Sequence, residues 1–448
     1  MQAFKLLING FCQTGLTKSK ENMFMREAII QSLKDEKIDN YLITETKKTG
    51  VEMFFIKQTL DMTRTEELEE WNVIVYHDEV KDGRKLRGCA DCSIHQGMTQ
   101  EEMRKAISGA YMAAGYALNP YYDIVKGSGR EIAKCISSLA GMPLNEAAGR
   151  MAKALFAKDD SEECFINSAE LFVEKKVVNI LNSAGVDCEY EDYLVKGEFV
   201  VQCLEPSDVE LYQSFSYDEL DEDSLMALVE NKLIAVADRA RANKAPAAGN
   251  YDVLLSEDSV REVLSFYIQR AEASYIYQKY SSYEIGTKVQ GEHVEGEKLN
   301  ITLHSSVPYD DMGIRMKDCE LICDSELRQI HGGLRLCQYL GVEPTGVYNK
   351  MIVGEGKQSL EELKKGRVLH VVSFSDFYMD AFSGHFAGEI RLAYLYNNDS
   401  VTLVTGGSIN GSLIEAQGRL AFSKERYDSR SYSGPYAVLL KDIPVSGE

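Results

Sequence analysis

Cysteine spacing gives the first candidate for chemistry in this sequence. Cys89 and Cys92 have a spacing used in redox and metal sites, and Cys319 with Cys323 could complete a four-thiolate zinc site. Both pairs fall in alternating strand patterns, where residues three apart face opposite sides of a sheet. We therefore favour buried thiols over a shared zinc site. The role of Cys89 and Cys92 stays open.

Two predicted turns carry other candidate groups. Asp310 and Asp311 precede Gly313, and paired carboxylates can serve acid–base catalysis or bind a hard cation. Ser383 and His385 suggest a nucleophile and its base, but the G-x-S-x-G pattern of a nucleophile elbow is missing. Turn geometry alone explains Asp and Gly at such places. We take these five residues as a candidate binding cleft and assign them no catalytic role.

The seven histidines offer no local metal site. No two of them have the spacing of H-E-x-x-H on a helix. They stand at positions 77, 95, 293, 304, 331, 370 and 385. We therefore expect no metal cofactor in this chain.

The composition is that of a globular chain. Of its 448 residues, 44% are hydrophobic and 27% are charged, and about 100 to 200 residues per domain predicts two to four domains. The net charge is −21, without a basic cluster. Because phosphate backbones attract the opposite sign, direct binding to nucleic acid is not expected.

Targeting signals and cysteine usage indicate in which cellular compartment the protein is expected. No stretch approaches the roughly 18 apolar residues of a membrane span, and the amino-terminal "MQAFKLLINGFC" has no cleavage site for a leader after it. The ten cysteines are scattered, unlike a secreted disulfide framework, so we expect reduced thiols. These features predict a cytoplasmic protein without membrane contact.

The first half predicts helices that alternate with antiparallel strands. Residues 20–36 predict a helix, and strands turning at Thr49-Gly50 and at Asp82-Gly83 follow. Thr99 and Glu102 form a capping box for a helix that runs to about Ala117.

A similar order follows in the next part of the chain. We expect a helix near residues 167–184, strands around Lys196-Gly197, and a helix from Leu220 to Ala242. The order helix, hairpin, helix suggests a duplication of residues 1–120 in residues 160–243.

A linker divides the chain. The stretch "NKAPAAGN" at 243–250 predicts a boundary between an N-terminal region, 1–243, and a C-terminal domain, 244–448. The second half opens with an uninterrupted helix over 261–280, and strand-like runs dominate the rest. The predicted class is α+β: an N-terminal half of antiparallel sheets and long helices, and a mostly β C-terminal domain opened by one long helix.

The second half resembles the TldD/PmbA family, whose motifs occur in the same order. The stretches that carry the resemblance are "APAAGNYDVLLSEDSVREVL", "PYDDMGIRMKDCELICDSELRQI", "LGVEPTG", "VGEGKQSLEELKKG", "MDAFSGHFAGEIRLAYLYNNDSV" and "GGSINGSLIE". The first half matches more loosely, in "RGCADCSIHQGMTQEEMRKAI" and "NPYYD".

The resemblance also identifies what is missing. TldD-type chains resemble zinc peptidases with HExxxH on the helix that opens the C-terminal domain and a cysteine ligand near the C-terminus. The HExxxH positions fall near Phe266, Tyr267 and Ala271, which cannot bind zinc or act as the base. No cysteine follows Cys337, and the matching stretch is "SRSYSGPYAVLL".

This pattern is similar to the PmbA type, also called TldE. The resemblance implies a non-catalytic subunit of a zinc metallopeptidase heterodimer that acts on unfolded or flexible peptides, with zinc in the TldD-type partner. A homodimer is an option for the isolated chain. The older family label, modulator of DNA gyrase, is a genetic description. The net negative charge of this chain argues against direct contact with DNA.

Two other functions stay open at this point. One is a free-standing enzyme with a rebuilt site around Asp310, Asp311 and His385. The other is a peptide-binding scaffold without a peptidase partner. A neighbouring gene for an HExxxH chain favours the subunit, and activity of the lone chain that survives chelation favours the enzyme.

Overall fold

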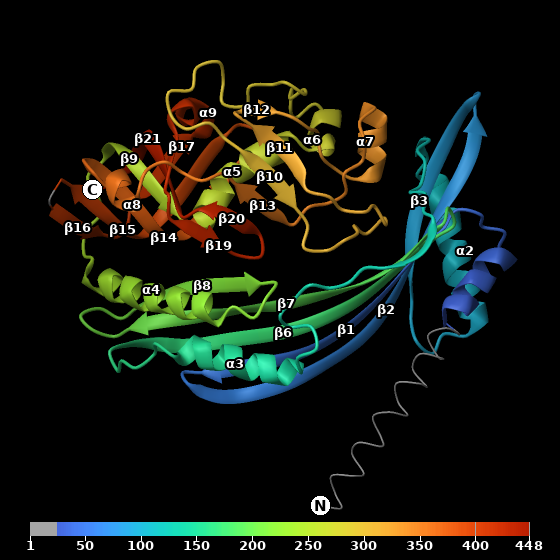
Figure 1. The fold of residues 1–448 in the computed structure, drawn as a ribbon, viewed down its shortest axis with the longest axis horizontal. Helices are drawn as coiled ribbons and strands as arrows, with labels where there is room; N and C mark the ends of the chain where they lie inside the picture. Colours follow the sequence, from blue (N-terminus) through green and yellow to red (C-terminus); the bar gives the residue numbers. More distant parts are fainter. Residues whose placement is uncertain (1–24, 399, 448) are drawn as a thin grey trace, which may run out of the picture.

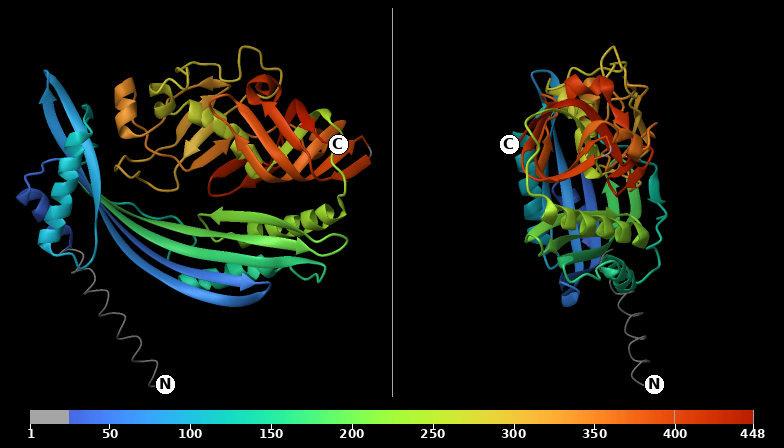
Figure 2. Two further views of the ribbon diagram at one scale, coloured as in Figure 1. Left: turned by 180° about the vertical axis from the view of Figure 1, so that it is seen from behind. Right: turned by 90° about the vertical axis from the view of Figure 1, so that its left-hand side faces the viewer.

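The computed structural model describes residues 25–398 and 400–447. Its N-terminal half is built on one long curved sheet, and its C-terminal half is rich in shorter strands (Figure 1). Figure 2 shows the sheet running beneath the C-terminal half and then turning up beside it. The predicted α+β class is confirmed.

The curved sheet has the strand order β4-β3-β2-β1-β6-β7-β5, and β8 also pairs with β7. Neighbouring strands are antiparallel except for β5 with β7. Alternate side chains are buried along β6 and β7, as expected for strands with one face on a core. The strands are β1 (Tyr41–Ile56), β2 (Thr59–Lys81), β3 (Arg84–Ile94), β4 (Asn119–Pro120), β5 (Gly129–Ile132), β6 (Cys164–Asn182), β7 (Val186–Cys203) and β8 (Val209–Tyr217).

Helices cover the sheet at both ends. A helical segment over 25–35 and α2 (Gln100–Tyr116) form one core with β2 and β3, and Thr99 caps α2 through the predicted capping box. At the other end α3 (Leu144–Phe156) and α4 (Glu222–Arg241) form a second core with β6, β7 and β8. Both cores place buried apolar residues on one face of the sheet, which fixes its register.

The order helix, three strands, helix therefore occurs twice in the N-terminal half. The duplication itself stays a prediction. The amino-terminal stretch considered for a leader, and residues 20–24 of the first expected helix, lie outside the described residues.

Three predictions for this half were wrong. Thr49-Gly50 and Lys196-Gly197 are not turns, because both lie inside single long strands that are paired on both sides. Residues 167–184 are not helical: β6 spans Cys164–Asn182, and its β-branched residues fit a pleated strand better than a helix. The Asp82-Gly83 turn is confirmed, with φ values of 51° and 71°.

Five strands of the C-terminal half form a closed ring. β9 (Gly249–Ser256), β14 (Arg367–Met379), β15 (His385–Asn397), β17 (Ser408–Ser412) and β21 (Ala437–Ser446) pair in a circuit. A second sheet has the order β12-β11-β10-β13-β20-β19, and α5 (Asp258–Arg270) packs in the core that both share. The remaining elements are α6 (Ala273–Tyr277), β10 (Ile301–His304), β11 (Cys319–Cys323), β12 (Glu326–Leu327), α7 (Leu334–Leu340), β13 (Lys350–Val353), α8 (Leu360–Leu363), β16 (Ser400–Val404), α9 (Leu413–Ala416), a 3-10 turn (Gln417–Arg419), β18 (Ala421–Phe422), β19 (Arg426–Asp428) and β20 (Tyr432–Pro435).

The segment between the halves contains neither helix nor strand from residue 242 to residue 248. A boundary near residues 243 and 244 agrees with this and stays a prediction. Within the described part of the chain, no helix combines the length and the apolar character that a membrane crossing needs.

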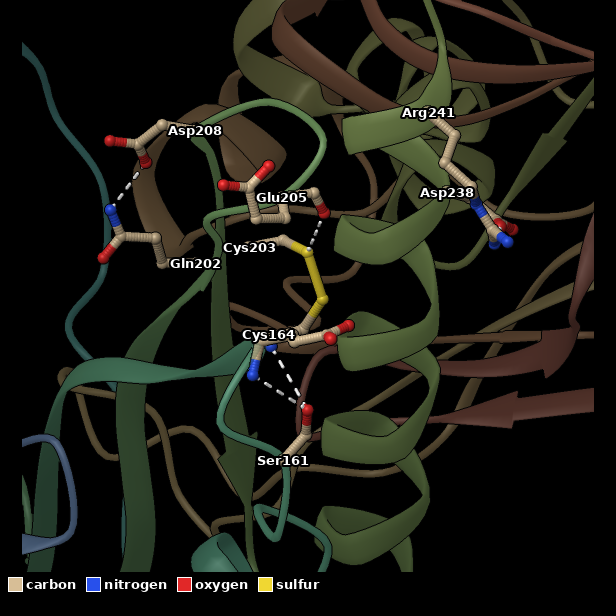
Figure 3. The surroundings of a disulfide bond; sticks show 9 residues. Ser161, Cys164, Gln202, Cys203, Glu205, Asp208, Asp238 and Arg241 are labelled. Carbon is tan, nitrogen blue, oxygen red and sulfur yellow. Dashed lines mark hydrogen bonds and ion pairs between the residues drawn. A yellow bond between two sulfur atoms is a disulfide. The ribbon is translucent and has the colours of Figure 1, made fainter.

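One disulfide corrects the expectation of reduced thiols. Cys164 and Cys203 are direct cross-strand partners in β6 and β7, and their sulfur atoms are bonded. Figure 3 shows the bond beside α4. Seven other described cysteines are free. The sequence could not indicate this pair, because its members are 39 residues apart and become neighbours only through strand pairing.

Candidate functional site

Helix α5 occupies the position where the resemblance places peptidase chemistry. It begins directly after β9, and Glu257 between them has φ 56° and ψ −131°, a conformation rare outside glycine. The helix packs against β9, β14 and β20. Its buried residues are Val260, Val263, Leu264, Phe266 and Tyr267.

The three residues at the HExxxH positions are core residues. Phe266 is 2% exposed, and Tyr267 and Ala271 are fully buried. The Tyr267 hydroxyl donates a hydrogen bond to Gln417 Oε1 over 3.1 Å, and burial raises the pKa of Tyr267 well above its usual value. Two apolar side chains and a buried neutral phenol do not fit a zinc ion, which needs imidazole, thiolate or carboxylate ligands.

The expectation of an uninterrupted helix over 261–280 was wrong. α5 ends at Arg270, and α6 begins at Ala273. The break occurs where His331 pairs with the chain: Ala273 N–H donates to the His331 carbonyl (2.8 Å), and His331 N–H donates to the Ala271 carbonyl (3.2 Å). The His331 ring also meets the Ile268 carbonyl, with 2.9 Å from Nε2 to the oxygen. These contacts satisfy carbonyls that a longer helix would have used.

The predicted turn at Asp310 packs against the N-terminal sheet. Tyr309 belongs to an apolar cluster with Val186 and Tyr190 of β7. Gly313 has φ 82°, and a Cβ there would stand 2.8 Å from Val186. Asp311, the residue that follows Asp310, is exposed. This turn is therefore part of the contact between the two halves of the chain.

Asp310 is a buried carboxylate inside that turn. Its Oδ1 accepts hydrogen bonds from the N–H groups of Met312 (3.0 Å) and Ile314 (2.7 Å), while its buried Oδ2 has no hydrogen-bond partner among the described residues. Burial raises the pKa of Asp310 to about 6, against the lowering effect of those N–H groups. The geometry is that of an Asx turn, and burial destabilises the charged form of its carboxylate.

Ser383 and His385 lie in a different turn, between β14 and β15. The Ser383 hydroxyl donates to Asp380 Oδ2, and the His385 N–H donates to Ser383 Oγ over 3.2 Å. Hydrogen bonds from the Ser383 hydroxyl and from the backbone N–H groups of Phe382 and Ser383 hold the pKa of Asp380 below its usual value. Gly384 has φ 76° and lies against Ile414 and Phe266. The two predicted turns thus have different neighbours, and the structure does not bring the five residues of the candidate cleft into one cluster.

The cysteine pairs also occupy separate places. Cys89 and Cys92 lie on β3 and pack in different apolar clusters, as expected for residues three apart on a strand. Cys319 and Cys323 lie on β11, and burial raises the pKa of Cys319, like that of Cys92, to about 11. In the described ranges no three His, Cys, Asp or Glu residues come together as a metal-binding group.

Three cavities follow β7 where it faces the C-terminal half, and sequence reasoning missed all of them. Their β7 linings are successive: Tyr190 to Tyr193, then Lys196 to Glu198, then Val200 and Gln202. Their volumes are about 300, 440 and 670 Å³. Each is completed by residues of the C-terminal half more than 50 residues away in sequence, so no local motif could indicate them.

Arg430 fixes this junction between the two halves. Its guanidinium donates to the Tyr193 carbonyl (2.9 Å) and pairs with Asp192 (2.9 Å) and Asp218 (2.7 Å). Its backbone N–H donates to the Ser216 carbonyl over 2.8 Å. The strand β8 therefore meets the C-terminal half through main-chain and charged contacts.

The fold defines a two-part α+β protein whose C-terminal half opens with α5, a helix that carries core residues at the positions where the resemblance places HExxxH. Residues 248–447 match the family described as the PmbA/TldA metallopeptidase C-terminal domain. The match lies within the C-terminal half and agrees with the family resemblance that the sequence motifs predicted. A search of curated proteins gave no match.

Solved structures share the fold over nearly the whole chain. TldE from Thermococcus kodakarensis superposes with a TM-score of 0.76 at 15% identity and covers 94% of this chain and 100% of its own. A protein named as a candidate modulator of DNA gyrase, from Thermotoga maritima, gives 0.74 at 15% identity, with 94% and 99% covered. Another so named, from Bacteroides thetaiotaomicron, gives 0.73 at 16% identity, again with 94% and 99% covered.

Proposed function

We propose that this chain is the non-catalytic, TldE-like subunit of a TldD-type zinc metallopeptidase heterodimer. The observation that carries the proposal is the burial of Phe266, Tyr267 and Ala271 in the core of a PmbA/TldD-family domain. In this proposal α5 corresponds to the active-site helix of a TldD-type chain, but its side chains pack in the core. The zinc and the general base then belong to the partner chain.

A subunit without its own metal can still contribute to peptide cleavage. Its cavities along β7 and β8 offer the free edge of β8 and polar side chains to an extended substrate, and strand addition uses main-chain hydrogen bonds of any peptide. Such binding selects unfolded or flexible segments, because a folded substrate has no free strand to add. We place this heterodimer in the cytoplasm.

The decisive experiment is co-purification with a TldD-type chain, followed by metal analysis and digestion of an unstructured peptide. We expect less than a tenth of one zinc per chain for the lone protein, and no cleavage by it. The pair is expected to cleave and to lose activity on chelation. A partner whose HExxxH glutamate is changed to glutamine is the control, because any cleavage left in that pair comes from this chain. Such residual cleavage, or stoichiometric zinc in the lone chain, would refute the proposal.

A further inference from the structure

Two arginines from the two halves of the chain line the largest of the three cavities along β7. Arg239 comes from α4 and Arg391 from β15, and the cavity between them measures about 670 Å³. Its other walls are Val200 and Gln202 of β7, residues 208–212 at the start of β8, and residues 373–375 of β14.

Neither guanidinium is neutralised at close range. Among the described residues, no carboxylate lies within ion-pair distance of Arg239 or Arg391. Arg239 donates to the backbone carbonyl of Glu210, and the Arg391 side chain has no hydrogen-bond partner in the described ranges. By contrast, Arg430 at the same junction pairs with two aspartates.

The two carboxylates that line this cavity, those of Asp208 and Glu210, accept hydrogen bonds from side-chain amides. Asp208 accepts a hydrogen bond from Gln202 Nε2 over 2.7 Å, and Glu210 Oε1 accepts one from Asn167 Nδ2 over 3.0 Å. Both carboxylates thus point at neutral amides. Burial, together with the nearby Arg391 charge, holds the pKa of Arg239 below its usual value, although the Glu210 charge opposes this shift. Two like charges that line one cavity repel each other, and an anion between them turns that repulsion into attraction.

The cavity also suits an extended chain. Among the described residues, β8 is an edge strand that pairs only with β7, so a free strand edge borders the cavity on one side. The β14 residues Ser373 and Phe374 pair with β15 in an irregular register. Ser373 and Ser375 add hydroxyls to its wall, although Ser375 already donates to Glu389.

We propose that this cavity binds an acidic segment of an extended peptide, with a ligand carboxylate held between Arg239 and Arg391. The inference deepens the proposed function and rests on it, because the ligand is a peptide. Guanidinium groups bind carboxylates through two parallel N–H bonds, which gives both strength and orientation. The chain carries a net charge of −21 and repels acidic peptides as a whole, so their binding requires a local cationic site.

The test compares two fluorescently labelled ten-residue peptides that differ only in central Asp and Glu residues changed to Asn and Gln. Anisotropy is measured with the full chain, alone and with its TldD-type partner. We expect the acidic peptide to bind at least about tenfold more tightly. Arg391→Glu should remove that preference, and Arg391→Lys should retain part of it. The control Arg84→Glu makes the same charge change at the exposed β2–β3 turn and should have no effect.

Each outcome decides a different claim. Equal binding of both peptides, or a preference that survives both Arg391→Glu and Arg239→Gln, overturns the acidic-ligand site and leaves peptide binding intact. Absence of binding for both peptides, with the partner present, overturns the proposed function as well. Circular dichroism of each variant shows that it is folded, and Arg391 is exposed enough to tolerate substitution.

Discussion

Lys232 of α4 places its ammonium nitrogen 3.5 Å from the carboxylate of Glu257, the residue before α5. The side chains are 9% and 14% exposed, so this ion pair is largely buried and joins the two halves of the chain. Asp258 follows directly, and burial raises its pKa. The pair thus anchors the start of α5.

Lys232→Met tests this anchor. Removing one partner of a buried pair leaves the other charge without compensation, and we expect the free energy of unfolding to fall by about 3 kcal/mol or more. The control Lys158→Met breaks the exposed pair with Glu230, where a change within about 0.5 kcal/mol is expected. Urea unfolding followed by circular dichroism measures both. Similar effects of the two substitutions would show that the buried pair is no anchor.

Asp310→Asn tests the buried carboxylate between the halves. The folded-state pKa is about 6 and the ordinary value is 3.8, so the folded protein holds this proton more tightly than the unfolded chain does. Stability therefore falls as pH rises from about 4 to 6 and stays lower above that window. The difference of about two pKa units corresponds to at most about 3 kcal/mol.

Asparagine keeps the oxygen that accepts from Met312 and Ile314 but has no charge to bury. We expect Asp310→Asn to be more stable than the wild type at pH 7.5 and close to it at pH 4.5. Thermal unfolding at both pH values measures this, with the exposed Asp61→Asn of β2 as control. A loss of stability of the same size at both pH values would contradict the expectation.

Local signals in the sequence predicted local structure well. The capping box at Thr99 and the Asp82-Gly83 turn are present, because each depends on neighbours within four residues. Gly50 and Gly197 wrongly predicted turns, because glycine also occurs within strands, and only the pairing with distant strands distinguishes the two cases. The cavity with Arg239 and Arg391 is assembled from strands and a helix far apart in sequence, and no local pattern encodes it.

The disulfide leads to a prediction about thiol number. The chain has ten cysteines, and a bond between Cys164 and Cys203 leaves two fewer to react. Titration with a thiol reagent in denaturant should give two more thiols after reduction than before. The double variant Cys164→Ser with Cys203→Ser should abolish that difference. Equal counts for the wild type with and without reductant would mean that these thiols are free.

Two glycines with opposite surroundings allow a matched test of packing. A Cβ at Gly197 would stand 2.3 Å from the Glu170 carbonyl oxygen and 2.6 Å from the Phe215 ring, whereas a Cβ at Gly149 in α3 would meet nothing within 4 Å. Gly197→Ala should lower the free energy of unfolding by about 1–3 kcal/mol, because the strands must move apart. Gly149→Ala should raise it by up to about 1 kcal/mol, because alanine favours the helix. Opposite signs in urea unfolding support a glycine kept for close strand packing, while a stabilising Gly197→Ala would mean that β7 has room there.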